Sequence, residues 1–285
     1  MFEICEIELF ARNLVEIKGG IIESVEYAQW LGERRRAQLE SLVGWAFTDV
    51  RRHGKALIFC FENVGIGSKF LVSRLGQAGV WRSSLWKGHE KSFACSFEIA
   101  WPSGSSKTLA LYDRSRTSTL ELVGAIADSE SLAAYGPDPL SDQFTLEWVR
   151  FCCGRYKTPI KALMLRPEYF AGIGNWVANE VLFRANIAPD TAADSLDGAQ
   201  TERLLIALLK TIAAGLSAER VEFAKVYGRS QKPCYICGTA IKKIMIGGRG
   251  TFFCEKCQDP QWREPDPVSA DFVGAIAKIA EEIEC

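Results

Sequence analysis

Histidine is almost absent from this chain, which contains only His53 and His89 among its 285 residues. A catalytic triad built on histidine, or a metal site rich in histidine, therefore has little material to use. No run of 18 or more apolar residues occurs, so we expect no membrane-spanning helix and no membrane partner. The first residues carry acids in place of the basic segment and apolar run of a secretory signal, and we therefore expect a cytoplasmic protein.

Net charge gives little indication of a nucleic-acid partner, because it is only −1 at pH 7. The charges are unevenly distributed, however. Residues 225–256 hold seven lysines and arginines against one acid, whereas residues 259–285 hold seven acids against two bases. An acidic tail thus masks a basic module, and a basic module is suited to a phosphate backbone. Shorter basic clusters at residues 34–36 and 51–55 also fit an ordinary solvated surface.

Length and composition predict a globular α+β chain of two domains, since 285 residues with 48% apolar content can form two cores. Residues 1–130 predict a β-sandwich that starts with a short helix, because short apolar or alternating segments are separated by glycine, serine and asparagine. The clearest expected strands are residues 56–62, 70–72, 92–98 and 108–112. Residues 131–141 contain two prolines and a glycine, and we interpret them as a linker.

Helical periodicity dominates the next segment, residues 142–225. We expect helices near residues 144–152, 158–165, 174–186 and 200–216, with Ser141 capping the first. Residues 226–258 should form a pair of β-hairpins. In the tail, residues 259–285, a last helix would place four apolar residues on one face, which either packs on its own chain or contacts a partner or second copy. Those residues are Phe272, Ile276, Ile279 and Ile283.

Four cysteines have the spacing of a structural zinc site, with two C-x2-C pairs separated by sixteen residues. Zn2+ prefers a tetrahedron of thiolates, and each pair presents two sulfurs to one point. A site closed by four thiolates performs no hydrolysis, so we expect one structural Zn2+. Gly238, Gly247 and Gly248 would supply the turns, and the loop would present Arg249 to a phosphate or only to solvent. The ligands would be Cys234, Cys237, Cys254 and Cys257.

Six cysteines lie outside the zinc pattern. Disulfides are rare in the cytoplasm, so we expect reduced and mostly buried thiols at these positions. They are Cys5, Cys60, Cys95, Cys152, Cys153 and Cys285.

Several recognisable segments follow one another in a fixed order along the chain. Residues 170–189 read FAGIGNWVANEVLFRANIAP, and the cysteine-bearing segment contains KPCYICGT followed by GGRGTFFCEKCQ. Shorter blocks keep the same order: RRHGK at 51–55, LGQAG at 75–79, DRSR at 113–116 and GPDPLSD at 136–142. Over residues 1–258 the chain resembles formamidopyrimidine-DNA glycosylases and endonuclease VIII.

This resemblance implies an N-terminal β-sandwich domain, a helix-two-turn-helix domain, a C-terminal zinc ribbon over residues 226–258, and DNA as the partner. In the family, an asparagine and a finger arginine hold phosphates around the lesion, which implies the same for Asn175 and Arg249. The turn before Asn175 would also offer backbone N–H groups to a phosphate. Lys161 and Arg116 match other phosphate-binding positions, and Tyr227, which starts the matching finger segment, is a further candidate for contact with DNA. A bacterial protein of this kind would associate with the nucleoid.

The N-terminus departs from the family pattern. Relatives expose an N-terminal proline whose amine attacks the sugar C1′ of a flipped nucleotide, and Phe2 occupies that nucleophile position here. A bulky second residue prevents removal of the initiator, so we expect Met1 to remain. Its amine would then lie one residue beyond the family geometry, and such a misplacement is costly in rate.

Other reactive positions are kept. Glu3 matches the family acid that protonates the sugar ring oxygen, and Glu6 keeps its register. Lys55 matches a hairpin lysine that contacts the phosphates of the lesion. It is the only other amine with a positional argument for attacking C1′, although a solvent-facing lysine would fit the pattern too.

The positions for base flipping are changed as well. The family inserts methionine, arginine and phenylalanine into the gap left by the flipped nucleotide, and the matching residues are Gln77, Ser115 and Thr117. Serine and threonine are too short to fill the gap, and extruding a base costs a few kcal/mol. The DNA would then already be unpaired or distorted, or the protein would bind DNA without excising a base.

Three hypotheses follow. The first is a DNA N-glycosylase in which Met1 or Lys55 supplies the amine, or water replaces it, with AP-lyase activity in doubt. The second is a catalytically inactive sensor or regulator that binds damaged DNA. The third is an RNA-binding zinc-ribbon protein.

Overall fold

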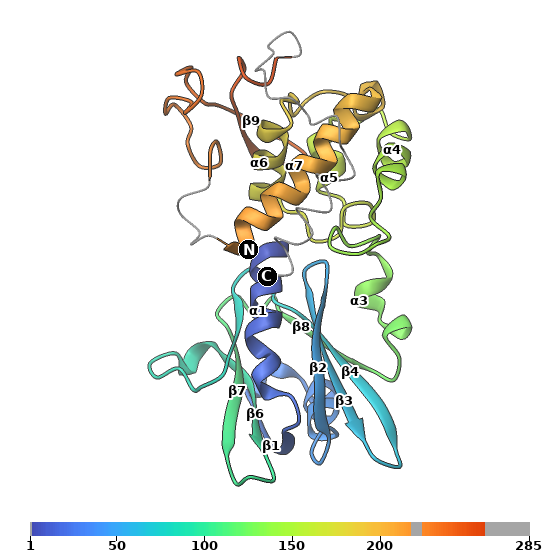
Figure 1. Ribbon diagram of the computed structural model, residues 1–285. Helices are drawn as coiled ribbons and strands as arrows, with labels where there is room; N and C mark the ends of the chain where they lie inside the picture. Colours follow the sequence, from blue (N-terminus) through green and yellow to red (C-terminus); the bar gives the residue numbers. More distant parts are fainter. Residues whose placement is uncertain (1, 218–223, 260–285) are drawn as a thin grey trace. The chain divides into compact units, whose positions relative to one another are not determined.

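A computed structural model describes residues 2–217 and 224–259 of the chain (Figure 1). The chain divides into two compact units, Met1–Ala134 and Tyr135–Cys285. Met1 and the helix expected in the tail lie outside the described residues.

Eight antiparallel strands form one hydrogen-bonded sheet in the first unit, in the order β5-β7-β6-β1-β2-β3-β4-β8. The strands are β1 (Ile21–Tyr27), β2 (Ala46–His53), β3 (Ala56–Asn63), β4 (Gly67–Arg74), β5 (Gly79–Arg82), β6 (Phe93–Ala100), β7 (Ser106–Asp113) and β8 (Thr119–Val123). The four expected strands correspond to β3, β4, β6 and β7.

The two halves of this sheet face each other. They meet between β1 and β2 at a single residue pair, Ile21 opposite Ala46. Phe47 of β2 packs against Phe97 of β6 with 6.2 Å between ring centroids. Phe59 of β3 packs against Trp81 of β5 at 5.0 Å. The aromatic core therefore lies between the halves, and the predicted β-sandwich is confirmed.

Helix α1 (Ile4–Leu14) packs against β2 and β3, and in Figure 1 it lies between β2 and the β6–β7 side of the sheet. It begins with a capping box, in which the Glu3 N–H donates to Glu6 Oε2 at 2.8 Å and the Glu3 side chain accepts from the Glu6 N–H. Its buried residues recur every three or four positions, as in an amphipathic helix. Two shorter helices complete this unit, α2 (Glu33–Glu40) and α3 (Glu130–Ala133).

The second unit starts with helices, as predicted. They are α4 (Leu146–Gly154), α5 (Ile160–Met164), α6 (Asn175–Arg184) and α7 (Gly198–Ser217). The expected cap at Ser141 is wrong: its hydroxyl donates to the Asp138 carbonyl at 2.8 Å. Thr145 caps α4 instead and accepts the Trp148 N–H at 3.2 Å.

A two-stranded finger follows, formed by β9 (Lys242–Ile246) and β10 (Arg249–Phe253). Gly247 and Gly248, with φ of 58° and 71°, make the two-residue turn between them, a conformation that glycine adopts without strain. The predicted second hairpin is reduced to one bridge between Pro233 and Ala240, flanked by backbone hydrogen bonds of Cys234 with Thr239 and of Gln231 with Ile241. Within the described ranges no helix is both long and apolar enough to cross a bilayer.

Candidate functional site

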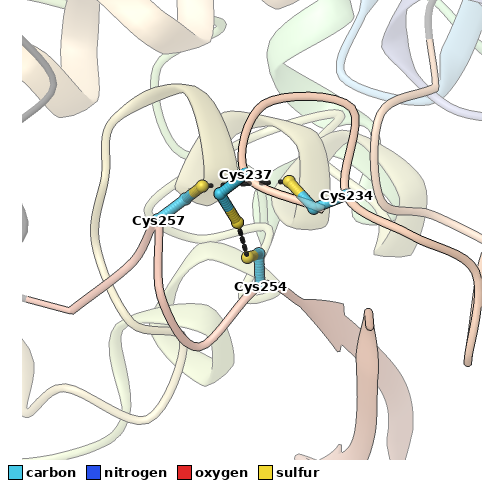
Figure 2. Close-up of side chains that lie close together, drawn as sticks. All are labelled: Cys234, Cys237, Cys254 and Cys257. Carbon is cyan, nitrogen blue, oxygen red and sulfur yellow. Dashed lines mark hydrogen bonds between the residues drawn. The ribbon is translucent and has the colours of Figure 1, made fainter. Parts of the chain in front are cut away.

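The four cysteine sulfurs converge at one point of the finger (Figure 2). All four Sγ atoms lie within 4.8 Å of one another. The separation is 3.8 Å between Cys234 and Cys257 and 3.4 Å between Cys237 and Cys254. Thiolates around Zn2+, at bonds of about 2.3 Å, would lie about 3.8 Å apart in a tetrahedron. The donor set therefore fits one structural Zn2+, as the spacing predicted.

The cysteine turns also form the core of the finger. Cys234, Cys254 and Cys257 are buried together with Val226 and Phe183, the latter from the last turn of α6. The Ile236 N–H donates to Cys234 Sγ at 3.5 Å, which fixes the sulfur within its turn. A metal at this point would therefore hold the finger together and fasten it to α6.

The start of α6 and the finger hairpin are joined by direct hydrogen bonds. Asn175, the first residue of α6, donates from Nδ2 to the Gly250 carbonyl at 3.0 Å. Gly250 follows Arg249 on β10. Lower down the helix, Asn179 Oδ1 accepts the Phe252 N–H at 2.6 Å. We call this contact the helix–finger junction; it consists of Lys161, Asn175, Asn179, Gly250, Thr251 and Phe252.

Lys161 lies inside the helix–finger junction with 0% of its surface exposed. Its Nζ donates to Asn175 Oδ1 at 2.7 Å and to Thr251 Oγ1 at 2.9 Å. The sequence predicted that Lys161 contacts a phosphate, yet its amine is fully buried and not accessible to a ligand in this structure. Lys161 instead orients Asn175, which is only partly buried.

Arg249 and Tyr227 lie at the surface of the finger. Tyr227 is 38% exposed and its ring meets Phe252 edge-on, with 5.5 Å between centroids. Both side chains are accessible to a ligand on the outer side of the finger. Their predicted contacts with DNA stay a prediction.

Two buried polar residues of α6 were not assigned a role from the sequence. Glu180 has 0% exposure, and its carboxylate accepts the N–H groups of Lys225, Val226 and Tyr227 at 2.7, 3.0 and 2.8 Å. Asn179 is 1% exposed. The signal was an Asn-Glu pair inside an otherwise apolar helix, because buried polar groups need partners. Glu180 fixes the segment that leads into the finger.

Phe2, at the nucleophile position of the resemblance, packs on the core of the first unit. Its ring lies 5.2 Å from that of Phe10, at 89° between planes. Glu3, which follows, is 5% exposed and belongs to the capping box with Glu6. The chain start is therefore anchored by an aromatic side chain and a helix cap.

Lys55 occupies the tight turn between β2 and β3, where His53 pairs with Ala56. It is partly buried. Gly54 before it has φ of 57°, a value that favours glycine. A partly buried ion pair between Arg52 of β2 and Glu8 of α1, 2.7 Å from Nε to Oε2, joins this hairpin to the helix that follows Glu3.

The three changed base-flipping positions come together in space. The Gln77 N–H donates to Thr117 Oγ1 at 2.9 Å, and the hydroxyls of Ser115 and Thr117 are 2.7 Å apart. A Cβ on Gly76 would lie 2.3 Å from Thr117 Oγ1, so the two turns pack closely. The side chains of Ser115 and Thr117 are short, and together with the Gln77 N–H they hold the two turns together.

Arg116 is exposed between Ser115 and Thr117. Its backbone has φ of 53°, an unusual value for a residue other than glycine. Its guanidinium carbon lies 5.3 Å from the centre of the Trp30 ring, a cation–π distance. The turn therefore presents this cation in a defined position.

The five described cysteines outside the zinc site are buried and form no disulfide with one another, as expected. Burial raises the pKa of Cys152 and of Cys153 to about 12, and it raises the pKa of Cys5 and Cys95 further. These thiols are inert at neutral pH. Cys285 lies outside the described residues.

Three family models match consecutive parts of the chain. They are the formamidopyrimidine-DNA glycosylase N-terminal domain over residues 1–120, the formamidopyrimidine-DNA glycosylase H2TH domain over 135–225, and the zinc finger found in FPG and IleRS over 231–260.

Curated relatives agree with these models. The chain is 33% identical over 237 residues to the formamidopyrimidine-DNA glycosylase of Listeria monocytogenes, covering 76% of this chain and 83% of that protein. It is 29% identical over 280 residues to that of Shouchella clausii, covering 90% and 99%.

Solved structures agree as well. Lactococcus lactis formamidopyrimidine-DNA glycosylase, bound non-covalently to DNA containing an AP site, gives a TM-score of 0.78 at 28% identity and covers 90% of this chain and 99% of its own. A complex of the Lactococcus lactis protein with DNA containing FAPY-dG gives 0.77 at 28%, covering 90% and 100%.

A sandwich, a helix-two-turn-helix domain and a four-thiolate finger, in this order along one chain, define a class of zinc-containing DNA-repair proteins. The chain belongs to the formamidopyrimidine-DNA glycosylase family.

Proposed function

We propose that this protein is a DNA N-glycosylase of base-excision repair that acts on damaged DNA. The observation that carries the proposal is the presence of all three domains in a fold that aligns with a DNA-bound glycosylase over 90% of the chain. The relatives that match are DNA glycosylases, and their complexes contain AP-site or FAPY-dG DNA.

Lys55 is our candidate for the attacking amine. The Lys55 nitrogen forms a bond to C1′ while the bond from C1′ to the base breaks; the base leaves with the electron pair and gains a proton, and the amine loses one. The C1′–O4′ bond then breaks, O4′ takes a proton from Glu3, and the nitrogen and C1′ form a Schiff base. The Phe2 ring packs on Phe10 and so anchors the start of the chain. This packing favours Lys55 over the N-terminal amine as the attacking group.

An unpaired or distorted target fits the turns at Gln77, Ser115 and Thr117. Removing a base from a stacked duplex costs a few kcal/mol, which a bulky wedge partly offsets. Here the hydroxyls of Ser115 and Thr117 bond to each other and neither side chain fills such a gap. We therefore propose single-stranded or locally opened DNA as the preferred substrate.

DNA would be held through its phosphates. Asn175 bonds Gly250 in the helix–finger junction, and Arg249 directly precedes Gly250. Arg116 offers a further cation from the sandwich domain. Tyr227 would contact the same strand from the finger. Lys161 would act through Asn175, which it orients.

An inactive sensor is the second candidate. The packed Phe2 and the absence of a bulky residue at positions 115 and 117 favour it, because both remove features of the family's reaction. An assay with damaged oligonucleotides distinguishes the glycosylase from the inactive sensor.

The test uses the full chain with oligonucleotides that carry an AP site or an oxidised base, single-stranded and duplex, with borohydride to reduce any Schiff base. We expect a covalent adduct that forms faster on single strands and disappears in Lys55→Ala. Lys107→Ala, an exposed lysine paired with Glu16, is the matched control and should react normally.

Tight binding with neither adduct nor base release would establish the sensor reading. An adduct that persists in Lys55→Ala but is lost when the N-terminal amine is blocked would assign the attack to that amine. Intact mass would show whether Met1 is retained.

The site of action would be the bacterial cytoplasm, at the nucleoid, since the curated relatives named above are bacterial proteins. A contact of residues 259–285 with a partner or second copy also stays a proposal.

A further inference from the structure

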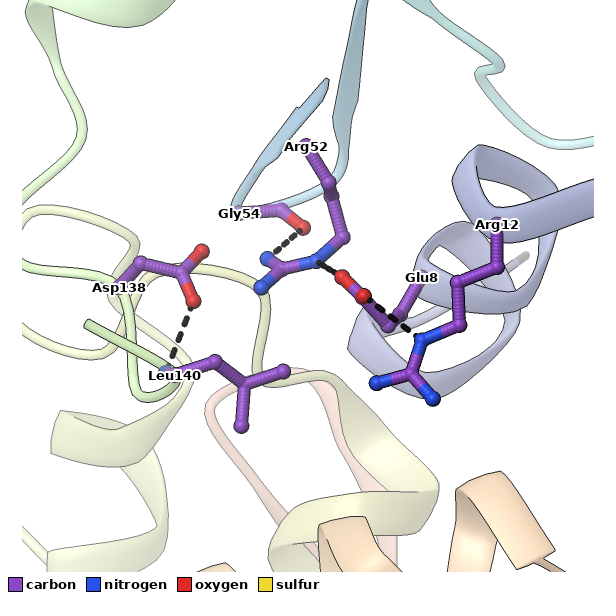
Figure 3. A network of polar contacts seen from close by, with 6 residues as sticks. All are labelled: Glu8, Arg12, Arg52, Gly54, Asp138 and Leu140. Carbon is purple, nitrogen blue, oxygen red and sulfur yellow. Dashed lines mark hydrogen bonds and ion pairs between the residues drawn. The ribbon is translucent and has the colours of Figure 1, made fainter. Parts of the chain in front are cut away.

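One carboxylate of helix α1 binds two arginines (Figure 3). Glu8 Oε1 lies 3.1 Å from Arg12 Nε, one helical turn further on, and Glu8 Oε2 lies 2.7 Å from Arg52 Nε on strand β2. The Arg52 side chain is only 4% exposed, whereas that of Arg12 is 36% exposed. The pair with Arg12 is thus a surface contact, and the pair with Arg52 is an internal one.

Arg52 also holds the turn that carries Lys55. Its Nη1 donates to the Gly54 carbonyl at 3.1 Å, and Gly54 directly precedes Lys55 (Figure 3). A guanidinium has several N–H donors in one rigid plane, so it can bond a helix and a turn at fixed relative positions. A single lysine amine, on a flexible stem, would fix this geometry less well.

The neighbouring arginine shows that position 52 is special. Arg51 is 59% exposed and bonds Asp49 of its own strand at 2.8 Å. Strand geometry places the two side chains on opposite faces. An enclosed ion pair is often no more stabilising than apolar side chains of similar size, which points to a role of Arg52 in placing the groups that it bonds.

We propose that Arg52 is a positioning residue that sets the Lys55 turn against the start of helix α1, and so fixes the amine of Lys55 relative to the carboxyl of Glu3. This inference rests on the proposed function. Glu8 stands five residues after Glu3, about 7.5 Å along the helix axis, so its ion pair sets the position of the hairpin close to the capping box. Both groups act on the same sugar, one at C1′ and one at O4′, and small errors in placement reduce such a rate strongly.

The experiment compares Arg52→Met, Arg52→Lys and the control Arg51→Met in the full chain, under single-turnover conditions with single-stranded AP-site DNA and borohydride. Three quantities are recorded: the rate constant of adduct formation, its amplitude and the DNA concentration at half saturation. Arg52→Met should lower the rate constant about 10- to 100-fold. Its amplitude and half-saturating concentration should stay within about twofold, because Arg52 does not hold the DNA. Arg52→Lys should recover part of the rate, and Arg51→Met should match the wild type.

These readouts separate positioning from simple loss of fold. Partial unfolding lowers the amplitude and leaves the rate constant of the folded fraction unchanged. Should Arg52→Met not fold, Glu8→Gln keeps the shape and one hydrogen-bond acceptor while removing the charge. It should slow the reaction about threefold or more at full amplitude.

A normal rate constant in Arg52→Met or in Glu8→Gln, with the wild type active, would overturn the inference alone. The same follows from an equal loss of rate in Arg51→Met. A wild type that forms no adduct would overturn the proposed function and this inference with it.

Discussion

Asp113 organises the turn that carries Ser115, Arg116 and Thr117. It is 1% exposed, and its carboxylate accepts the N–H and hydroxyl of Ser115 at 2.9 and 2.6 Å and the N–H of Ser118 at 2.7 Å. Burial alone would raise the pKa of Asp113, but these hydrogen bonds outweigh it and hold the pKa below its usual range. The turn therefore depends on an ionised carboxylate.

Asp113→Asn should lower stability at pH 7 by about 1–3 kcal/mol, since buried N–H groups lose a charged acceptor. The folded-state pKa is lower than the unfolded one, so the contribution of Asp113 is complete above the unfolded value, about 3.9, and is lost as pH falls through the folded value. Urea unfolding between pH 7 and pH 2.5 should show a smaller acid-dependent loss in Asp113→Asn than in the wild type. Asp128→Asn, an exposed change, serves as control, and equal slopes in all three proteins would refute the prediction.

The direction in which individual side chains point could not be predicted from the sequence. Lys161 has the residue type and position of a phosphate ligand, yet its amine points inward to Asn175 and Thr251. Thr251 lies 90 residues further along the chain, and no local pattern reports such a contact. Arg52 and Glu8 are likewise 44 residues apart, and no local pattern reports their contact. From the sequence, Arg52 could not be distinguished from the other residues of a solvated basic cluster.

Elements with a local cause were predictable. Helices α4 to α7 follow from apolar residues repeated every three or four positions, and the metal site follows from two short cysteine turns. The cap at Ser141 failed because a serine can also bond backward to a carbonyl, here that of Asp138. The junction of α6 with β10 depends on hydrogen bonds between residues more than 70 positions apart. Only the order of the family motifs indicated that the two elements act together.

The finger should need Zn2+ to fold and to bind DNA. We expect one Zn2+ per chain, and a strong chelator should lower DNA affinity at least about tenfold, because Cys234, Cys254 and Cys257 form the core that fastens β9 and β10 to α6. Metal analysis, thermal melting and DNA titration measure these effects. Added Zn2+ should restore all three and Mg2+ should not; full affinity in metal-free protein would contradict the prediction.

For the whole molecule, a net charge of −1 conceals a basic module beside an acidic tail. We therefore expect the affinity for DNA to depend on a few side chains at defined positions, and the net charge of the chain to contribute little. Two such groups are Asn175, which bonds Gly250 in the helix–finger junction, and Arg249, which directly precedes Gly250.

Asn175→Ala and Arg249→Ala should each weaken DNA binding by about 1–3 kcal/mol. The two should differ in salt dependence. Loss of the Arg249 cation should reduce the slope of log affinity against log salt by about 1, while loss of the neutral Asn175 should leave it unchanged. Fluorescence anisotropy from 50 to 300 mM salt measures both, with Lys210→Ala on α7 as an exposed control. Wild-type affinity in both variants would remove the junction from the DNA-binding surface.

The enclosed ammonium of Lys161 has a consequence for how this half of the chain unfolds. Its Nζ donates to one oxygen on α6 and to one on the ribbon, so the ribbon cannot detach without breaking the bond to Thr251 and opening the buried cluster around the cysteines. A hydrogen bond from a charged donor contributes about 1.5–3 kcal/mol. Fraying of the ribbon by itself is therefore disfavoured, and the helices and ribbon over residues 135–217 and 224–259 should melt as one cooperative block.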